Sequence, residues 1–181
     1  MSTFDLAIPV ILQHEGGWVS NPNDPGGQTN FGISMTTIKK MGFSTHELGV
    51  DNLTDPDCLK KMTVESAKNV YREIYWDPFR YDNINDQTVA TKILDCGVNC
   101  GSIKANFMAQ KAANDCGHLL ALDGKLGPQS FAAINSIDSQ TYIKAYADQM
   151  TKNYLAIINN NPSLAEFQSN WLKRAQWGVK P

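Results

Sequence analysis

The sequence predicts a mainly α-helical protein with a small loop or β-hairpin lobe near its N-terminus. Apolar residues recur at the three- and four-residue spacing of amphipathic helices through most of the 181 residues. The alternation of apolar and polar residues that marks a half-buried strand is weak throughout. The helical pattern is interrupted over residues 14–34, HEGGWVSNPNDPGGQTNFGIS, where glycine, asparagine and proline predict turns. A short hairpin between Trp18 and Ile33 is the most strand that we expect there.

The first predicted helices lie on either side of this stretch. One runs from about residue 3 to residue 14 or 15, with Pro9 inside it at the cost of one backbone hydrogen bond. The other carries an apolar stripe over residues 64–75, and Thr63 is suited to cap its N-terminus. The sequence WDPF, which follows the stripe, should end this second helix.

The second half of the chain repeats the helical pattern. Residues 89–98 form the stripe of a heavily buried helix that should close near Gly101, and residues 103–114 form that of a more amphipathic helix. A long late helix is predicted by the stripe over residues 143–157. The sequence NNNP should end it, and residues 164–175 outline a last helix.

Length and charge exclude several classes of protein. A chain of this size is expected to form one domain, and it can bury roughly 70% of its extended surface without help from a metal or a disulfide. The formal net charge of −2 argues against a nucleic-acid-binding protein, which would carry a basic surplus. From Lys144 onward, five Lys and Arg residues stand against two Asp and Glu residues, which is only a mild basic bias.

The cysteines and histidines do not predict a metal site. No Cys-x-x-Cys sequence occurs, and Cys96 and Cys100 lack the further ligands that a zinc site needs. The histidines do not have the spacing of a zinc amidase. We therefore expect neither a metal nor a cofactor, and we interpret the cysteines as buried free thiols of a protein made in a reducing cytosol. These cysteines are Cys58, Cys96, Cys100 and Cys116.

Glu15 begins a stretch that has the features of a catalytic loop. A glutamic acid at the end of a buried helix has a rigid backbone, and a carboxyl partly withdrawn from water can act as a general acid. Asp24 lies in a predicted Asp-Pro-Gly-Gly turn, which would fold the loop back and aim Asp24 and the Thr29 hydroxyl at Glu15. One acid opposite a second carboxylate is the arrangement used for glycoside hydrolysis.

The same residues also allow plain structural roles. A glutamate after a helix is more often a solvated C-terminal residue than a catalyst. An aspartate before Pro-Gly usually only forms a turn. The spacing by itself therefore leaves the roles of Glu15 and Asp24 open.

Long sequence motifs add to this interpretation. The string HEGGWVSNPNDPGGQTNFGIS resembles the N-terminal signature of glycoside hydrolase family 108, the phage and prophage N-acetylmuramidases, whose pattern is E-G-G-[YW]-V-x-[ND]-P-x-D-P-G-G-x-T-N-x-G-I. Further segments resemble motifs of that family in the same order along the chain. They are MTVESAKNVYREIYWDPFRYDNI, ILDCGVNCG, DGKLGPQSFAAI and FQSNWLKRAQ. Together the motifs cover nearly the whole chain.

The resemblance implies a lysozyme-like fold and a reaction. A single muramidase domain would span residues 1–181, with the catalytic signature in residues 1–100 and a helical, peptidoglycan-associated part in residues 101–181 packed on it. The enzyme would hydrolyse the β-1,4 bond between N-acetylmuramic acid and N-acetylglucosamine in peptidoglycan. As a phage endolysin it would thereby lyse the host cell.

The resemblance also implies roles for the residues of the loop. Glu15 takes the place of the family's catalytic acid. The order Glu15, Asp24, Thr29 resembles the acid, Asp and Thr set of the larger phage-lysozyme class. We expect Asp24, assisted by Thr29, to position a water or to stabilise charge at the anomeric carbon. The interval from Asp to Thr is one residue shorter here. Cys100 and Asn170 also depart from the family pattern, but neither touches the proposed acid.

Sugar rings bind flat aromatic surfaces and side chains that form hydrogen bonds. The aromatic rings of the signature loop should therefore line the cleft, and asparagine amides should bind the acetamido groups. The predicted substrate-binding residues are Trp18, Asn30, Phe31 and Asn99. Tyr71 and Tyr75 lie on the apolar stripe of their helix, and we expect them mainly in the core.

The expected partner is the glycan strand of peptidoglycan, bound by a monomer. The apolar run LAIPVIL has no basic flank or cleavage site and is too short to span a bilayer, so we expect the protein in the host cytoplasm until lysis releases it to the periplasm and cell wall. The last helix, near Lys173, Arg174 and Lys180, could make a weak contact with outer-membrane lipid, although a solvated basic face is the simpler interpretation.

Two alternative functions remain open at this stage. A lytic transglycosylase or a chitinase also works with a single acidic glutamate, so Glu15 suits these enzymes equally. A non-catalytic wall-binding module could instead be built around the sequence DGKLGPQSF. A complete signature around Glu15 disfavours this second alternative.

Overall fold

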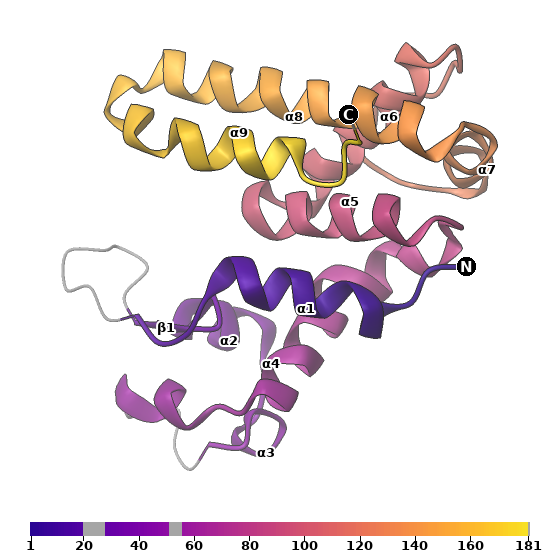
Figure 1. The fold of residues 1–181 in the computed structure, drawn as a ribbon. Helices are drawn as coiled ribbons and strands as arrows, with labels where there is room; N and C mark the ends of the chain where they lie inside the picture. The colour runs from indigo at the N-terminus through magenta and orange to yellow at the C-terminus, as the bar shows by residue number, and fades with distance from the viewer. Residues whose placement is uncertain (20–27, 51–55, 181) are drawn as a thin grey trace. The chain divides into compact units, whose positions relative to one another are not determined.

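The computed structural model describes residues 1–19, 28–50 and 56–180 (Figure 1). The chain divides into two compact units, which are described separately here. The N-terminal unit is Ile8–Pro78, and the C-terminal unit is Met1–Ala7 together with Phe79–Pro181. Helices predominate in the described residues, and the sheet found there is a two-stranded hairpin. The predicted mainly α, lysozyme-like fold is confirmed.

The N-terminal unit contains short elements around a small hairpin. The first helix matches its predicted range, and the predicted hairpin forms, with an isolated bridge from Val19 to Thr29 that extends it. The elements up to residue 79 are α1 (Phe4–Glu15), β1 (Thr29–Asn30), β2 (Ile33–Ser34), α2 (Met35–Met41), α3 (Thr45–Leu48), η1 (Pro56–Lys61), α4 (Val64–Tyr71), the π-helical turn η2 (Arg72–Trp76) and η3 (Asp77–Phe79).

Side-chain caps start the helices of this unit. The Ser34 hydroxyl accepts a hydrogen bond from the backbone N–H of Thr37 at 3.1 Å, which begins α2. Ser44 and Glu47 form a reciprocal capping box at the start of α3. The predicted cap at Thr63 is confirmed, because its hydroxyl accepts from the N–H of Ser66 at the start of α4.

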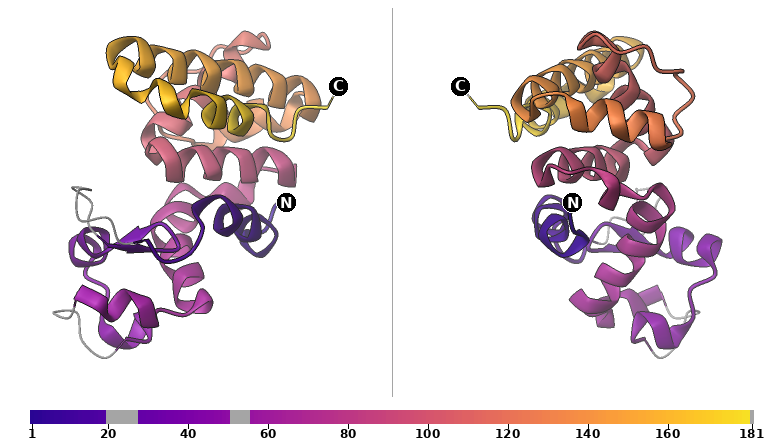
Figure 2. Two further views of the ribbon diagram at one scale, coloured as in Figure 1. Left: turned by 60° about the vertical axis from the view of Figure 1, so that its left-hand side comes forward. Right: turned by 90° about the vertical axis from the view of Figure 1, so that its right-hand side faces the viewer.

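The C-terminal unit is a helical bundle. Its helix α5 packs on α6, and α8 packs on both α6 and α9; Figures 1 and 2 show α8 and α9 side by side. Its elements are η4 (Tyr81–Asn83), α5 (Gln87–Cys100), α6 (Ser102–Asp115), α7 (Pro128–Ser136), α8 (Ser139–Asn160), η5 (Pro162–Phe167) and α9 (Gln168–Gln176). None of the helices in the described part of the chain has the length and hydropathy needed to cross a membrane.

Tyrosine rings of α8 pack against alanines of α6. The Tyr142 hydroxyl donates to the carbonyl oxygen of Ala109 at 3.1 Å, and the Tyr146 hydroxyl donates to that of Ala105 at 3.2 Å. All of these residues are buried. The small alanine side chains leave room for the rings, and each buried hydroxyl has an acceptor. The α6–α8 interface therefore combines apolar packing with satisfied polar groups.

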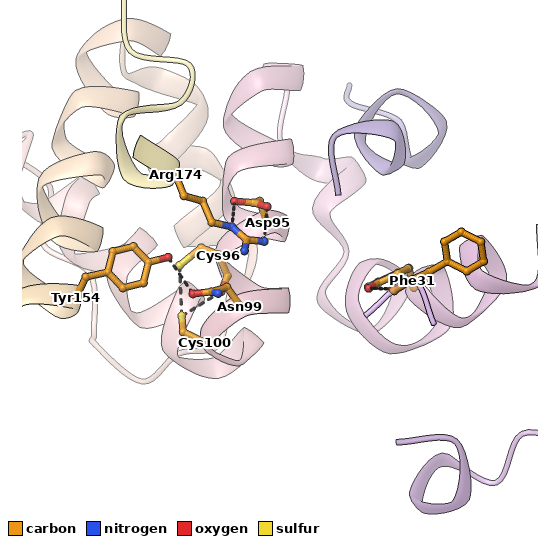
Figure 3. Close-up of polar contacts among 8 residues, drawn as sticks. Phe31, Asp95, Cys96, Asn99, Cys100, Tyr154 and Arg174 are labelled. Carbon is orange, nitrogen blue, oxygen red and sulfur yellow. Dashed lines mark hydrogen bonds and ion pairs between the residues drawn. The ribbon is translucent and has the colours of Figure 1, made fainter. Parts of the chain in front are cut away.

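An ion pair joins α5 to α9. Arg174 donates from Nε to Asp95 Oδ2 at 2.8 Å and from Nη2 to Asp95 Oδ1 at 2.7 Å, a bidentate arrangement that Figure 3 shows. Beside it, Lys92 Nζ donates to the carbonyl oxygens of Ala175 and Trp177, both at 2.6 Å. These carbonyls lie at the C-terminal end of α9, where helical partners are lacking. Burial lowers the pKa of Lys92 to about 8.

The ion pair yields a prediction about stability. Arg174→Met should lower the free energy of unfolding by about 3–5 kcal/mol, because it leaves the Asp95 carboxylate buried without its partner. Urea unfolding followed by circular dichroism measures the change. Lys173→Met, on an exposed neighbour in the same helix, is the control and should cost far less. Adding Asp95→Leu to Arg174→Met should recover most of the loss, and equal costs for the Arg174 and Lys173 variants would contradict a structural role for the pair.

Candidate active site

Glu15 lies at the end of the buried face of α1. Ile8 and Ile11 of the same helix face are almost fully buried, and Glu15 continues their stripe as the last residue of the helix, where it is half-buried. Gly16 ends the helix: its φ is +73°, and its N–H donates to the carbonyl oxygen of Leu12 at 3.2 Å. The core therefore holds the backbone of Glu15 while its side chain reaches the edge of the unit.

The hairpin that follows contains a strained turn. Thr29 pairs with Ser34 and Asn30 pairs with Ile33, so Phe31 and Gly32 form a two-residue loop. Both loop residues have positive φ, +50° for Phe31 and +73° for Gly32, as the hairpin turn of type I′ requires. Glycine adopts this conformation freely, whereas for a phenylalanine it costs on the order of 1–3 kcal/mol. Other contacts must therefore hold Phe31 in place.

The backbone of Gly32 lies close to the side chain of Glu15. A methyl carbon added to Gly32 would lie 2.6 Å from Glu15 Oε2, 3.0 Å from Glu15 Cβ and 2.9 Å from the Tyr71 hydroxyl oxygen. Contacts this short do not occur between real atoms of these kinds, so a side chain at this position would force its neighbours, the Glu15 carboxyl first, to move. The backbone of the turn thus covers one side of the Glu15 side chain.

Two tyrosines of the α4–η2 segment complete this environment. Tyr71 is buried, and its hydroxyl donates to the carbonyl oxygen of Phe31 at 2.6 Å. The ring of Tyr75 lies 5.8 Å from that of Tyr71, centroid to centroid. Burial and, secondarily, the negative charge of Glu15 raise the pKa of Tyr75. The expected core position is confirmed for Tyr71, whereas Tyr75 is only half-buried.

The other predicted residues of the loop have distinct surroundings. Trp18 is half-buried, and Lys60 Nζ lies 5.0 Å from the centroid of its ring, a cation–π contact. Thr29 exchanges backbone hydrogen bonds of 2.9 and 3.0 Å with Val19. Asn30 is buried, and its amide nitrogen donates to the carbonyl oxygen of Leu59 at 2.7 Å, which favours a structural role for this side chain.

The structure brings some predicted site residues together. Phe31 is tied to Glu15 through the turn, since its neighbour Gly32 contacts that side chain. Asp24 lies outside the described residues, so its predicted position opposite Glu15 stays a prediction. Asn99 belongs to the C-terminal unit, where it is an exposed residue of α5 that accepts a hydrogen bond at Oδ1 from the Tyr154 hydroxyl at 3.0 Å (Figure 3).

The DGKLGP sequence forms a loop organised by one buried side chain. Gln110 of α6 accepts at Oε1 from the N–H groups of Asp123 and Gly124, and its Nε2 donates to Asp123 Oδ1 and to the carbonyl oxygen of Lys125. Gly124 has a φ of +71°, and a methyl group there would meet Ile103 at 2.7 Å. A cavity of about 570 Å³ lies beside the loop.

The cysteines differ in burial from the expectation. Cys58 and Cys96 are buried, as predicted, but the prediction is wrong for Cys100 and Cys116, which are only half-buried near helix ends. All are free thiols, and Cys96 and Cys100, one turn apart on α5, lie with their sulfur atoms 3.3 Å apart (Figure 3). Over the described ranges, no three His, Cys, Asp or Glu side chains gather in a way that could hold a metal ion.

Comparison with known protein families identifies the chain. Residues 8–101, more than half of the sequence, match the family model described as Glycosyl hydrolase 108. The chain belongs to the glycosyl hydrolase 108 family. Residues 104–176 of this glycoside hydrolase match a second model, described as Predicted Peptidoglycan domain. The protein is therefore a peptidoglycan-degrading glycosidase, as the motifs predicted.

A solved structure agrees with this assignment. The glycoside hydrolase is similar to SagA of Brucella abortus, with 27% sequence identity and a TM-score of 0.71 over 96% of this chain and 89% of that one. No curated protein gives a significant match. The two family matches meet near residue 101, but the prediction that the two parts pack into one domain stays a prediction.

Sequence reasoning missed Gly32 and the tie between Tyr71 and Phe31. Gly32 had a usable signal, because a glycine that ends a two-residue turn between short polar and apolar runs indicates a hairpin. The sequence gives no such signal for Tyr71, because its position on the apolar stripe of the helix is typical of any core residue. The ion pair of Asp95 and Arg174 was also missed, although a lone acidic residue inside a buried stripe indicates a buried partner.

Gly32 yields a prediction about activity. Gly32→Ala should reduce peptidoglycan hydrolysis at least about tenfold, because the added methyl group displaces the Glu15 side chain and small misplacements in an active site are costly. Turbidity loss of purified cell walls measures the rate. Gly42→Ala is the matched control, since Gly42 has a φ of +76° and open space around it.

Both glycine variants should lose about 1–2 kcal/mol of stability from the positive φ alone. The Gly42 variant should keep its activity. Equal activity of the two variants at equal stability would show that the contact with Glu15 is unimportant.

Proposed function

We propose that this glycosidase is an N-acetylmuramidase with Glu15 as its general acid. It hydrolyses the β-1,4 bond between N-acetylmuramic acid and N-acetylglucosamine. The observation that carries the proposal is the place of Glu15, at the open end of a buried helix face and covered on one side by the Phe31–Gly32 turn. A partly shielded carboxyl on a rigid backbone suits proton donation to a bound sugar.

The proposed reaction runs in balanced steps. Glu15 donates its proton to the glycosidic oxygen as the bond from that oxygen to the anomeric carbon breaks, which leaves positive charge on the sugar ring. Asp24, assisted by the Thr29 hydroxyl, stabilises this charge or positions the attacking water. Water then adds its oxygen to the anomeric carbon, and the proton that it releases restores the acid. Each cycle consumes one water molecule and creates one reducing end.

The aromatic residues of the N-terminal unit would bind the glycan. Trp18 and Phe31 are half-buried, so part of each ring can meet a sugar face. Of the two asparagines, Asn30 is the less suited to bind an acetamido group, since its amide nitrogen is bonded to Leu59, whereas Asn99 is an exposed residue of the C-terminal unit. The loop around Asp123 is a second candidate for contact with the wall, in the part of the chain that matches the peptidoglycan model.

The biological role that we propose is that of a phage endolysin. The motifs along the chain, which resemble those of phage and prophage muramidases, support this role. The enzyme would act as a monomer, made in the host cytoplasm and released to the cell wall at lysis. A weak contact of the last helix with outer-membrane lipid would have to use Lys173 and Lys180, because Arg174 is bound to Asp95.

The role of Glu15 is tested by Glu15→Gln. This variant keeps the shape of the side chain but cannot donate the proton, so hydrolysis should fall by about 10²–10⁴-fold. A zymogram with embedded cell walls and a turbidity assay give the rate, and circular dichroism checks the fold. Clearing of walls at a rate close to that of the wild type would refute the assignment of Glu15 as the acid.

The bond that is cut is tested by the products. Digestion of purified peptidoglycan should release fragments with reducing N-acetylmuramic acid ends, which mass spectrometry identifies. Anhydro-muramic ends would show a lytic transglycosylase, and reducing N-acetylglucosamine ends would show cleavage of the other bond. Binding to cell walls without any release of fragments would contradict the enzymatic function.

A further inference from the structure

We propose that Tyr71 is a positioning residue for the hydrolytic reaction. Its hydroxyl holds the Phe31–Gly32 turn against the Glu15 side chain, and it thereby sets the place of the acid. The inference rests on the proposed role of Glu15. Tyr71 acts through the turn and need not touch the substrate.

The strands of the hairpin are anchored, since Asn30 is bonded to Leu59 and Ile33 is buried, but these contacts do not reach the loop residues Phe31 and Gly32. Each strand of the hairpin has two residues, and the sheet in the described residues has only these two strands. Isolated hairpins are marginal even when they are longer. Phe31 moreover has a φ of +50°, which a non-glycine residue leaves readily when nothing holds it. The Phe31–Gly32 loop itself therefore needs a contact from another element to stay closed.

Tyr71 supplies that contact from a rigid position. It is the last residue of α4, only 2% of the residue's surface is exposed, and Ala67 and Val70 of the same helix are also buried. A tyrosine ring has few rotatable bonds, so a buried ring places its hydroxyl at a nearly fixed point. From there it donates to the Phe31 carbonyl oxygen at 2.6 Å, across 40 positions of sequence. The hydrogen bond from Tyr71 thus holds Phe31, the residue with the strained backbone.

The Phe31–Gly32 turn, fixed in this way, restricts the conformations that the Glu15 side chain can adopt. The site for a methyl carbon on Gly32 lies within 3.0 Å of Glu15 Oε2, of Glu15 Cβ and of the Tyr71 hydroxyl oxygen, so these groups surround a single point. If the turn moves away, Glu15 gains rotamers that its present neighbours exclude. A proton donor that samples several positions spends less time in line with the glycosidic oxygen, which lowers kcat.

The local helix geometry agrees with a functional position. The regular helix α4 passes at Tyr71 into the π-helical turn η2, and such turns are rare and frequent at functional sites. The turn carries Tyr75, whose ring lies beside that of Tyr71. Burial and, secondarily, the negative charge of Glu15 raise the pKa of the Tyr75 hydroxyl. Two unusual backbone segments, this turn and the Phe31–Gly32 loop, therefore meet around one carboxyl group.

The test is Tyr71→Phe, which removes only the hydroxyl oxygen. Initial rates on soluble glycan fragments of peptidoglycan should show kcat reduced by about tenfold and KM changed by less than about twofold, because an interaction that orders the acid acts on the chemical step. Tyr142→Phe is the matched control: it removes a buried tyrosine hydroxyl that also donates to a backbone carbonyl, and its kcat should stay at the wild-type value.

A second variant separates positioning from general destabilisation. Asn-Gly adopts the turn with positive φ at both positions without help, so Phe31→Asn should close the turn in the absence of the hydroxyl. Added to Tyr71→Phe, it should restore kcat at least about threefold, even if the lost ring raises KM. A kcat of Tyr71→Phe equal to that of Tyr142→Phe, or no recovery of kcat by Phe31→Asn, would overturn the inference.

Glu15→Gln in the same series keeps the two proposals apart. If Glu15→Gln remains active, the proposed acid is wrong whatever Tyr71 does. If Glu15→Gln is inactive and Tyr71→Phe behaves like its control, the acid stands and only the positioning role fails.

Discussion

The position of the candidate acid depends on one steric constraint, the close approach of the Gly32 backbone to the side chains of Glu15 and Tyr71. This close approach joins three segments that are far apart in sequence: the end of α1, the hairpin turn and the end of α4. Each segment contributes a feature that is unfavourable alone, namely a half-buried carboxyl, a phenylalanine with positive φ and a buried hydroxyl. The hydrogen bond from the Tyr71 hydroxyl to the Phe31 carbonyl oxygen offsets two of these features, since it satisfies the hydroxyl and holds the strained residue.

In the C-terminal unit, charged side chains join α5 to α9 in addition to the apolar packing of the bundle. Asp95 on α5 binds Arg174 on α9, and Lys92 on α5 caps the end of α9. The two sequence motifs ILDCGVNCG and FQSNWLKRAQ, which are far apart in the sequence, thus meet in a single ion pair. Since removing one partner of a buried pair is costly, the two motifs are constrained together. A polar side chain also fixes the DGKLG loop, since Gln110 of α6 forms hydrogen bonds with Asp123 and Gly124.

Periodicity was sufficient for the long helices but did not predict the short helices α2, α3 and α7. The apolar stripes of α5, α6 and α8 extend over several turns, and these helices begin and end close to their predicted bounds. Helices α2 and α3 have seven and four residues, too few for a stripe, and they depend on the caps at Ser34 and Ser44. Helix α7 begins at Pro128 and was also missed, since its short apolar pattern follows a turn sequence. For α3, the Ser44–Glu47 capping box was a readable signal.

The sequence by itself determined the helical class of the fold, the place of Glu15 at the end of the first helix and, through its motifs, the family. These properties depend on local spacing and on strings of adjacent residues, which a sequence shows directly. Only the tertiary structure decided that Gly32 covers Glu15, that Tyr71 holds Phe31, and that Asn30 is turned to Leu59. Such contacts join residues 17 to 40 positions apart, and which of them form depends on how the buried faces of the helices pack, which local periodicity does not encode.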